Sequence, residues 1–125
     1  VVAPGEIAFG YVYFDSDIPE GSVLAFEFSV EAEPPSDYFL PVTVTEINNT
    51  GDQVVGMVVN QNAGTVDGPI AADVLCFGGD GTISAYVDSY VEQDDLAPGS
   101  TGSFAIDLFR EQCSAGIAAS SGYGR

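Results

Sequence analysis

The stretch "IAADVLCFGGDGTISAYVDSYV", residues 70–91, decides the fold class of this chain. Its apolar residues recur at every second position, which is the period of a β-strand with one buried face. The inward-facing residues would be Ile70, Ala72, Val74 and Cys76 in the first half, and Ile83, Ala85, Val87 and Val91 in the second. The outward-facing residues of the second half would be Tyr86, Asp88 and Tyr90. Between the halves, Gly-Gly-Asp-Gly at residues 78–81 has the composition of a tight hairpin turn.

The same period continues on both sides of this hairpin. Its inward-facing residues are Leu24, Phe26, Phe28 and Val30, then Val42 and Val44, and finally Phe104, Ile106 and Leu108. Residues 53–60, "QVVGMVVN", form a continuous apolar run that favours a central strand buried on both faces. No segment keeps the helical period over more than a turn or two. We therefore predict an all-β fold, an immunoglobulin-like antiparallel β-sandwich of about six to eight strands.

One internal boundary is expected at "EAEPPSD", residues 31–37. Two adjacent prolines favour an extended connector and cannot donate to a strand ladder. The connector separates an N-terminal β-hairpin, within residues 1–32, from a sandwich body of about six strands that begins at residue 37 and continues to the C-terminal region, 37–125.

The charge of the chain narrows its class of partner. Its 19 acidic residues face two basic ones, and it has neither Lys nor His, so the net charge is -17. Such a polyanion repels nucleic acid and anionic lipid, and no apolar run is long enough to insert into a membrane. The chain begins at Val1 without a leader-like segment, so we expect a mature, extracellular protein, either secreted or on the cell surface.

The two cysteines, Cys76 and Cys113, predict one disulfide, the ordinary state of an even cysteine count in an exported protein. Cys76 would face inward, and Cys113 would follow the strand that ends at Phe109, so a bridge between neighbouring strands is geometrically reasonable.

The chain lacks the residues that the common nucleophilic catalytic mechanisms need. Without His or Lys the chain cannot build a Ser-His-Asp, Cys-His or Ser-Lys nucleophile, and we predict no enzyme activity and no cofactor. The densest acidic cluster, Glu92, Asp94 and Asp95, is the candidate calcium site, although a solvated loop explains it as well. Asn48 begins a glycosylation sequon. The tyrosines Tyr86 and Tyr90 could stack on sugars or could simply cover a sheet face.

From Gln53 onward the chain resembles the FxLYD-type immunoglobulin-like domains of exported bacterial and archaeal proteins. The residues that carry the resemblance are "VVGMVVNQNAGTVDGPIAADVLCFGGDGTI" and "DDLAPGSTGSFAIDL". The likeness covers roughly residues 37–121, and it departs at Gly78, where the family usually has Asp after its aromatic residue. It implies a non-catalytic sandwich module of extracellular proteins, often present in tandem.

A partial repeat connects the two ends of the chain. Ala3-Pro4-Gly5 corresponds to Ala97-Pro98-Gly99, and this alignment places Phe9 on Phe104, with one inserted residue. Residues 1–32 therefore resemble the last two strands of a preceding repeat. An isolated hairpin is marginal in water, so its aromatic residues need covering. We expect these to act as an assembly strand: Phe9, Tyr11, Tyr13, Phe26 and Phe28.

Three partners could cover the hairpin: the chain's own body, the missing half of a longer precursor, or another copy of the chain. Docking on a neighbour by strand addition gives a head-to-tail contact, which produces a homo-oligomer or a filament. The predicted function is thus a non-enzymatic extracellular structural or adhesive protein that self-associates into a filament or surface layer. The alternatives are a carbohydrate- or calcium-binding module and a fragment of a tandem-domain adhesin.

Overall fold

A computed structural model describes residues 7, 9, 14–31, 34 and 37–124 of the chain. The described residues form seven strands and no helix, and every strand pair is antiparallel. The prediction of an all-β fold is therefore confirmed. The strands are β1 Phe39–Asn49, β2 Gln53–Val59, β3 Val66–Phe77, β4 Ile83–Tyr90, β5 Asp95–Leu96, β6 Thr101–Asp107 and β7 Ala115–Gly124.

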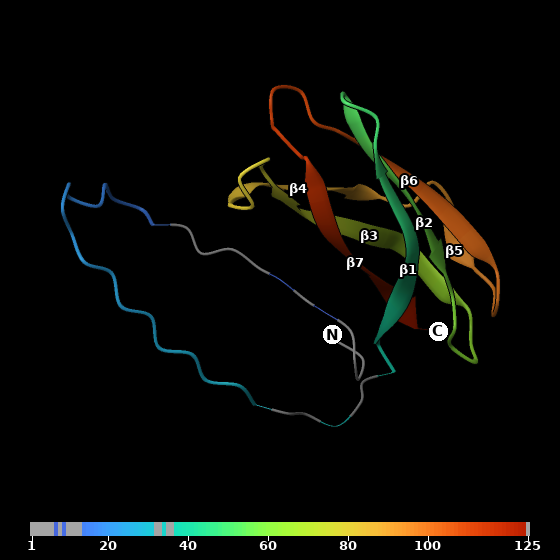
Figure 1. The fold of residues 1–125 in the computed structure, drawn as a ribbon. Helices are drawn as coiled ribbons and strands as arrows, with labels where there is room; N and C mark the ends of the chain where they lie inside the picture. Colours follow the sequence, from blue (N-terminus) through green and yellow to red (C-terminus); the bar gives the residue numbers. More distant parts are fainter. Residues whose placement is uncertain (1–6, 8, 10–13, 32–33, 35–36, 125) are drawn as a thin grey trace.

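The strands form one curled sheet in the order β4-β3-β7-β1-β2-β6, with β5 paired to β3 (Figure 1). The curl is made by β1, which changes its partner along its length. Its first residues, 39–42, pair with β7, whereas residues 43–49 pair with β2. At the far side of the curl the backbone N–H of Glu92, just after β4, donates to the carbonyl of Ser103 in β6. The two ends of the sheet thereby approach each other at one point.

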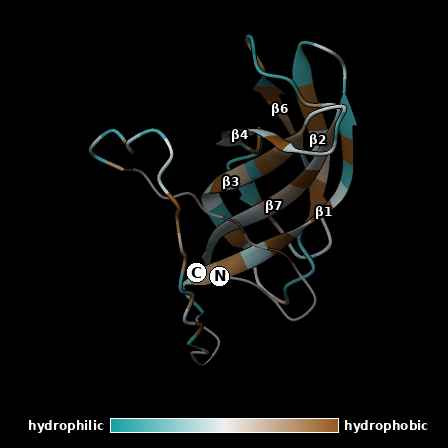
Figure 2. Ribbon diagram, turned by 60° about the vertical axis from the view of Figure 1, so that its left-hand side comes forward, coloured by the Kyte–Doolittle hydropathy of each residue, from teal (hydrophilic) through white to brown (hydrophobic). Residues whose placement is uncertain are grey.

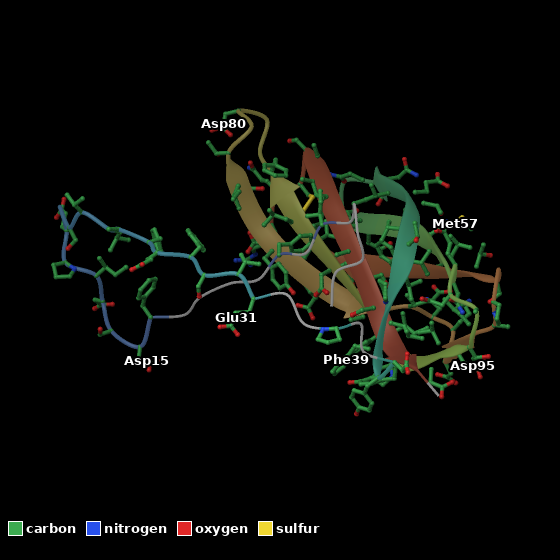
Figure 3. The ribbon with its side chains drawn as sticks, turned by 90° about the horizontal axis from the view of Figure 1, so that it is seen from below. Asp15, Glu31, Phe39, Met57, Asp80 and Asp95 are labelled. Carbon is green, nitrogen blue, oxygen red and sulfur yellow. A yellow bond between two sulfur atoms is a disulfide. The ribbon has the colours of Figure 1, made fainter. Side chains whose placement is uncertain are left out.

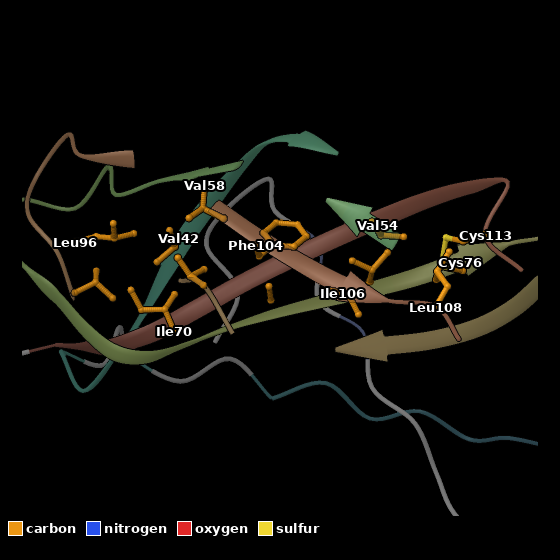
Figure 4. Packing of buried hydrophobic residues seen from close by; sticks show 14 residues of the cluster. Val42, Val54, Val58, Ile70, Cys76, Leu96, Phe104, Ile106, Leu108 and Cys113 are labelled. Carbon is orange, nitrogen blue, oxygen red and sulfur yellow. A yellow bond between two sulfur atoms is a disulfide. The ribbon is translucent and has the colours of Figure 1, made fainter. Parts of the chain in front are cut away.

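The hydrophobic core fills the inside of this curl (Figure 4). It is made of Val42, Val54, Val58, Val66, Ile70, Ala72, Val74, Cys76, Val91, Leu96, Phe104, Ile106, Leu108 and Cys113. All four residues predicted to face inward from β3 are buried, as are the three predicted from the segment at β6. The period-two pattern thus identified the buried faces of these two strands correctly.

Within the sheet, two details of the predicted burial are wrong. Ile83 is 66% exposed rather than inward-facing. Phe77 pairs with Ile83 while Cys76 pairs with Ala85, so Ser84 is an extra residue in β4 that reverses the alternation before it. The second error concerns β2, which buries one face only and leaves Met57 40% exposed on the other. The apolar residues on its outer face, Val55, Met57 and Val59, are half-buried or exposed, so the continuous apolar run does not mark a strand buried on both faces here.

Two residues in or next to β2, Gly56 and Asn60, have clear packing roles. A Cβ atom at Gly56 would overlap the Phe104 ring and lie 2.7 Å from the carbonyl oxygen of Glu46, so only glycine fits beneath this ring. Asn60 is fully buried just after β2, and its amide donates to the carbonyls of Gly64 and Leu96, at 2.8 Å each. These hydrogen bonds offset the cost of removing the Asn60 amide from water, so Asn60 can join two loops to the core from a buried position.

The predicted disulfide is present in the structure. Cys76 of β3 is bonded to Cys113, which precedes β7, with their Cα atoms 4.8 Å apart. The predicted turn at residues 78–81 joins β3 to β4, with Gly81 at a φ of 80°. There Asp80 accepts hydrogen bonds from the hydroxyl and the backbone N–H of Thr82. Both hydrogen bonds lower the pKa of the Asp80 carboxyl below its usual value, and the bond from the Thr82 hydroxyl has the larger effect.

The last strand, β7, was not predicted from the sequence, yet it lies between β3 and β1. Its sequence, AGIAASSGYG, is rich in small residues that have little intrinsic preference for strands. The small residues are required because neighbouring groups approach closely. A Cβ atom at Gly122 would lie 2.5 Å from Val66, and one at Gly124 would overlap the backbone of Asp37.

Candidate assembly surfaces

Residues 14–31, here called the arm, extend away from the sheet (Figure 1). All the arm residues are exposed, including Phe28 at 86% and Val30 at 93%. The structure assigns no strand to them, so the strand predicted around Leu24–Val30 is absent from the isolated chain. The physical reason is that a strand needs a neighbour for its ladder hydrogen bonds. Figure 2 shows that hydrophobic segments lie on the arm as well as in the body.

The predicted assembly residues have different environments. Phe26 and Phe28 stack on each other on the arm, with ring centroids 6.4 Å apart. Phe9 packs edge-on against Tyr86 of β4, with centroids 5.9 Å apart, so this residue contacts the body of its own chain. Tyr11 and Tyr13 lie outside the described residues, as does the whole of Ala3-Pro4-Gly5.

The body offers three places where a strand could add. Two are the outer edges of the sheet, β4 and β6, each with one neighbour in the sheet order of the described residues. The third is internal and lies where β1 leaves β7 after Val42. Beyond that point β7 residues 115–119 pair only with β3, and β1 residues 44–49 pair only with β2, within the described part of the chain.

A groove of about 410 Å³ opens at this split between β1 and β7. It is lined by Ile47, Asn48, Asn49, Val54, Cys113, Ser114, Ala115 and Gly116. None of these side chains carries a charge, although the whole chain has a net charge of -17. We name this feature the split groove.

A second hollow lies on the outer side of the sheet and is aromatic. Tyr38, Phe39 and Tyr123 form a ring cluster with centroid separations of 4.7 to 5.5 Å. Beside it is a pocket of about 200 Å³, lined by Phe39, Pro69, Ala71, Tyr90, Ser121, Gly122 and Tyr123. Of the two tyrosines considered for sugar stacking, Tyr90 lines this pocket. Tyr86 instead contacts Phe9 and donates its hydroxyl to Asp73.

The candidate calcium ligands do not converge. Glu92 accepts a hydrogen bond from the Ser103 hydroxyl, Asp94 accepts the N–H of Gly68 through its carbonyl, and Asp95 lies in β5. Figure 3 places Asp80 and Asp95 at separate parts of the body and Asp15 and Glu31 on the arm. No group of three or more metal-ligating side chains occurs among the residues that the structure describes. Calcium binding stays a prediction.

The glycosylation candidate Asn48 is exposed near the end of β1, where its amide donates to Glu46 at 2.7 Å. Its modification also stays a prediction.

One further surface residue, Phe109, was not among the residues predicted from the sequence. It is 92% exposed and has a positive φ of 52° in the turn after β6, next to Arg110. The signal was present as an aromatic residue directly before a basic one in a chain with only two basic residues.

Within the described residues, no helix has the length and apolarity needed to cross a membrane. No family model, curated protein or solved structure matches this chain, so the likeness to FxLYD-type domains rests on the quoted motifs alone.

Proposed function

We propose that this chain is a non-enzymatic extracellular structural protein that self-associates head-to-tail by strand addition. Its product would be a filament or a surface layer. The proposal also takes the curled sheet as an immunoglobulin-like sandwich. In support, core residues come from β3 on one side and from β2 and β6 on the other, and β1 changes partner between them.

The single observation that carries the proposal is the exposed, alternating sequence of the arm. Leu24, Phe26, Phe28 and Val30 share one face of an extended segment, and all four are exposed in the isolated chain. A contiguous apolar surface of this kind marks an interaction site. Burying four such side chains would contribute roughly 6–12 kcal/mol before the entropic cost of association.

The test compares two triple variants of the full chain that add the same charge. The first, Leu24→Asp, Phe26→Asp and Phe28→Asp, places carboxylates on the apolar face. The second, Val23→Asp, Ala25→Asp and Ser29→Asp, places them on the opposite face. We expect wild type to form polymers visible by electron microscopy and the first variant to remain monomeric. The second should still polymerise, although more weakly than wild type, because only one face of an added strand enters the partner while the added charge increases the repulsion between copies.

Equal loss of assembly in both variants would mean that the arm acts by hydrophobicity without strand-like register. A wild-type chain that stays monomeric at high concentration would contradict the proposed function itself.

A second candidate function is carbohydrate binding at the aromatic pocket. The observation in its favour is the uncharged lining with Phe39, Tyr90 and Tyr123, since sugar rings pack on exposed aromatic faces. This candidate, together with the tandem-adhesin alternative, would gain weight from a monomeric wild-type chain.

A further inference from the structure

The split groove is an interruption in an otherwise continuous sheet. Strand β1 pairs with β7 residues 120–123 and then separates from β7 to pair with β2. Beyond this paired stretch, residues 115–119 of β7 pair with β3 on one side. Within the described residues, no strand pairs with them on the other side. A strand placed there would continue the ladder that β1 begins, in the position that β1 vacates.

The bottom of the groove is already formed by side chains. A Cβ atom at Gly116 would lie 3.2 Å from Ile47 Cδ1 and 3.0 Å from Val74 Cγ1, so Ile47 of β1 reaches across to β7. Val54 and Cys113, both buried, also line the groove. An incoming strand would therefore place apolar side chains on a preformed apolar surface.

The other two open edges suit strand addition less well. The outer edge of β6 is interrupted at Ser103, whose carbonyl accepts the N–H of Glu92 and whose N–H donates to the Gln93 side chain. On β4 the exposed Asp88 would face another acidic chain, and Phe9 already packs on Tyr86. Interruptions and charges of this kind protect sheet edges from pairing.

We propose that the split groove is the acceptor site for residues 23–30 of a second copy of this chain, paired along β7 residues 115–119. This inference rests on the proposed function and deepens it by assigning the receiving surface. The open stretch of β1, residues 44–49, is six residues or about 20 Å long, a length that six of the eight residues in segment 23–30 would span as an extended strand. Both surfaces avoid the charge of the chain, because the groove lining is uncharged and residues 23–30 carry only Glu27.

The distribution of charge also favours a contact between the arm of one copy and the split groove of another. Arg110 is the only basic residue that the structure describes, and it lies in the turn that leads to the groove-lining Cys113. The arm carries Glu20 and Glu31 on either side of residues 23–30. A second copy therefore brings carboxylates to the end of the body that carries Arg110.

The experiment places one carboxylate in the groove of the full chain and a matched one elsewhere. Ala115→Asp lies in the split groove, and Ala105→Asp lies on the outer face of β6; both alanines are exposed in the isolated chain. We expect Ala115→Asp to weaken association about 100-fold or more, since the added strand would bury an unpaired charge. Ala105→Asp should assemble like wild type. Circular dichroism checks that both variants fold.

Asn49→Asp provides a second groove variant in case Ala115→Asp does not fold. It is isosteric, and its side-chain oxygen can still accept the N–H of Gly51 as Asn49 does now, at 2.6 Å. It should weaken association in the same direction.

Mixing then tests complementarity. The arm variant Leu24→Asp, Phe26→Asp and Phe28→Asp keeps an intact groove, whereas Ala115→Asp keeps an intact arm. Each alone should be monomeric, and the mixture should give a 1:1 complex by size exclusion with light scattering.

Three results would overturn the inference. If the arm variant is monomeric but Ala115→Asp polymerises, the arm is correct and the groove is wrong. If Ala105→Asp blocks assembly instead, the acceptor is β6. If wild type is monomeric and its arm resists protease until Ala115→Asp is introduced, the arm fills the groove of its own chain.

Discussion

Phe109 shows how a single residue can depart from what its backbone prefers. A φ of 52° is costly for a residue with a Cβ atom, by about 1–2 kcal/mol, and the Phe109 ring gains almost no burial in return. The turn is closed by the N–H of Glu111, which donates to the carbonyl of Leu108. Glycine would be the ordinary residue at this position.

We therefore expect Phe109→Gly to raise the free energy of unfolding by about 1 kcal/mol, through relief of the backbone conformation. The matched control, Phe109→Ala, removes the same ring but keeps the Cβ atom, so it should bring no gain. Urea unfolding of both variants measures the difference. A loss of stability in both would show that the ring itself supports the fold.

At the scale of elements, the disulfide fixes the start of β7 to the end of β3. Both cysteines are buried, and they are 37 residues apart in sequence. Cys113 also lines the split groove, so the bridge supports one wall of the proposed acceptor site. Because β7 has a composition of small residues, its place in the sheet depends on such tertiary constraints.

The double variant Cys76→Ala and Cys113→Ala should lose about 4 kcal/mol of stability in the chain-entropy account of a loop this long. Chemical denaturation, compared with reduced wild type, gives the value. Similar unfolding midpoints for oxidised and reduced wild type would mean that β7 is held by its strand pairing alone.

At the scale of the whole molecule, charge opposes association. Each copy has a net charge of -17 at pH 7, and the sequence pI is about 4.1. Repulsion between copies is screened by salt over about 10 Å at 0.1 M ionic strength. The uncharged groove and the nearly uncharged arm segment are where this repulsion is weakest.

Assembly should therefore strengthen as the pH falls from 7 toward the pI, because protonation of carboxylates removes negative charge from both partners. Light scattering at fixed protein concentration follows the change. Added calcium should act likewise, and sodium chloride at equal ionic strength is the control. A larger effect of calcium than of sodium would support the predicted calcium site. Association that is indifferent to pH and to both salts would show that the acidic surface takes no part.

The sequence by itself determined the all-β class, the buried faces of β3 and β6, the turn at Asp80 and the disulfide. These depend on local alternation, on glycine-rich turns and on cysteine count, all of which are visible along the chain. The outer exposure of β2, the bulge that turns Ile83 outward and the strand β7 were decided only by the tertiary structure. The reason is that they depend on which strands become neighbours. The split groove is of the same kind, because it exists only where β1 exchanges β7 for β2, and no local pattern records that change of partner.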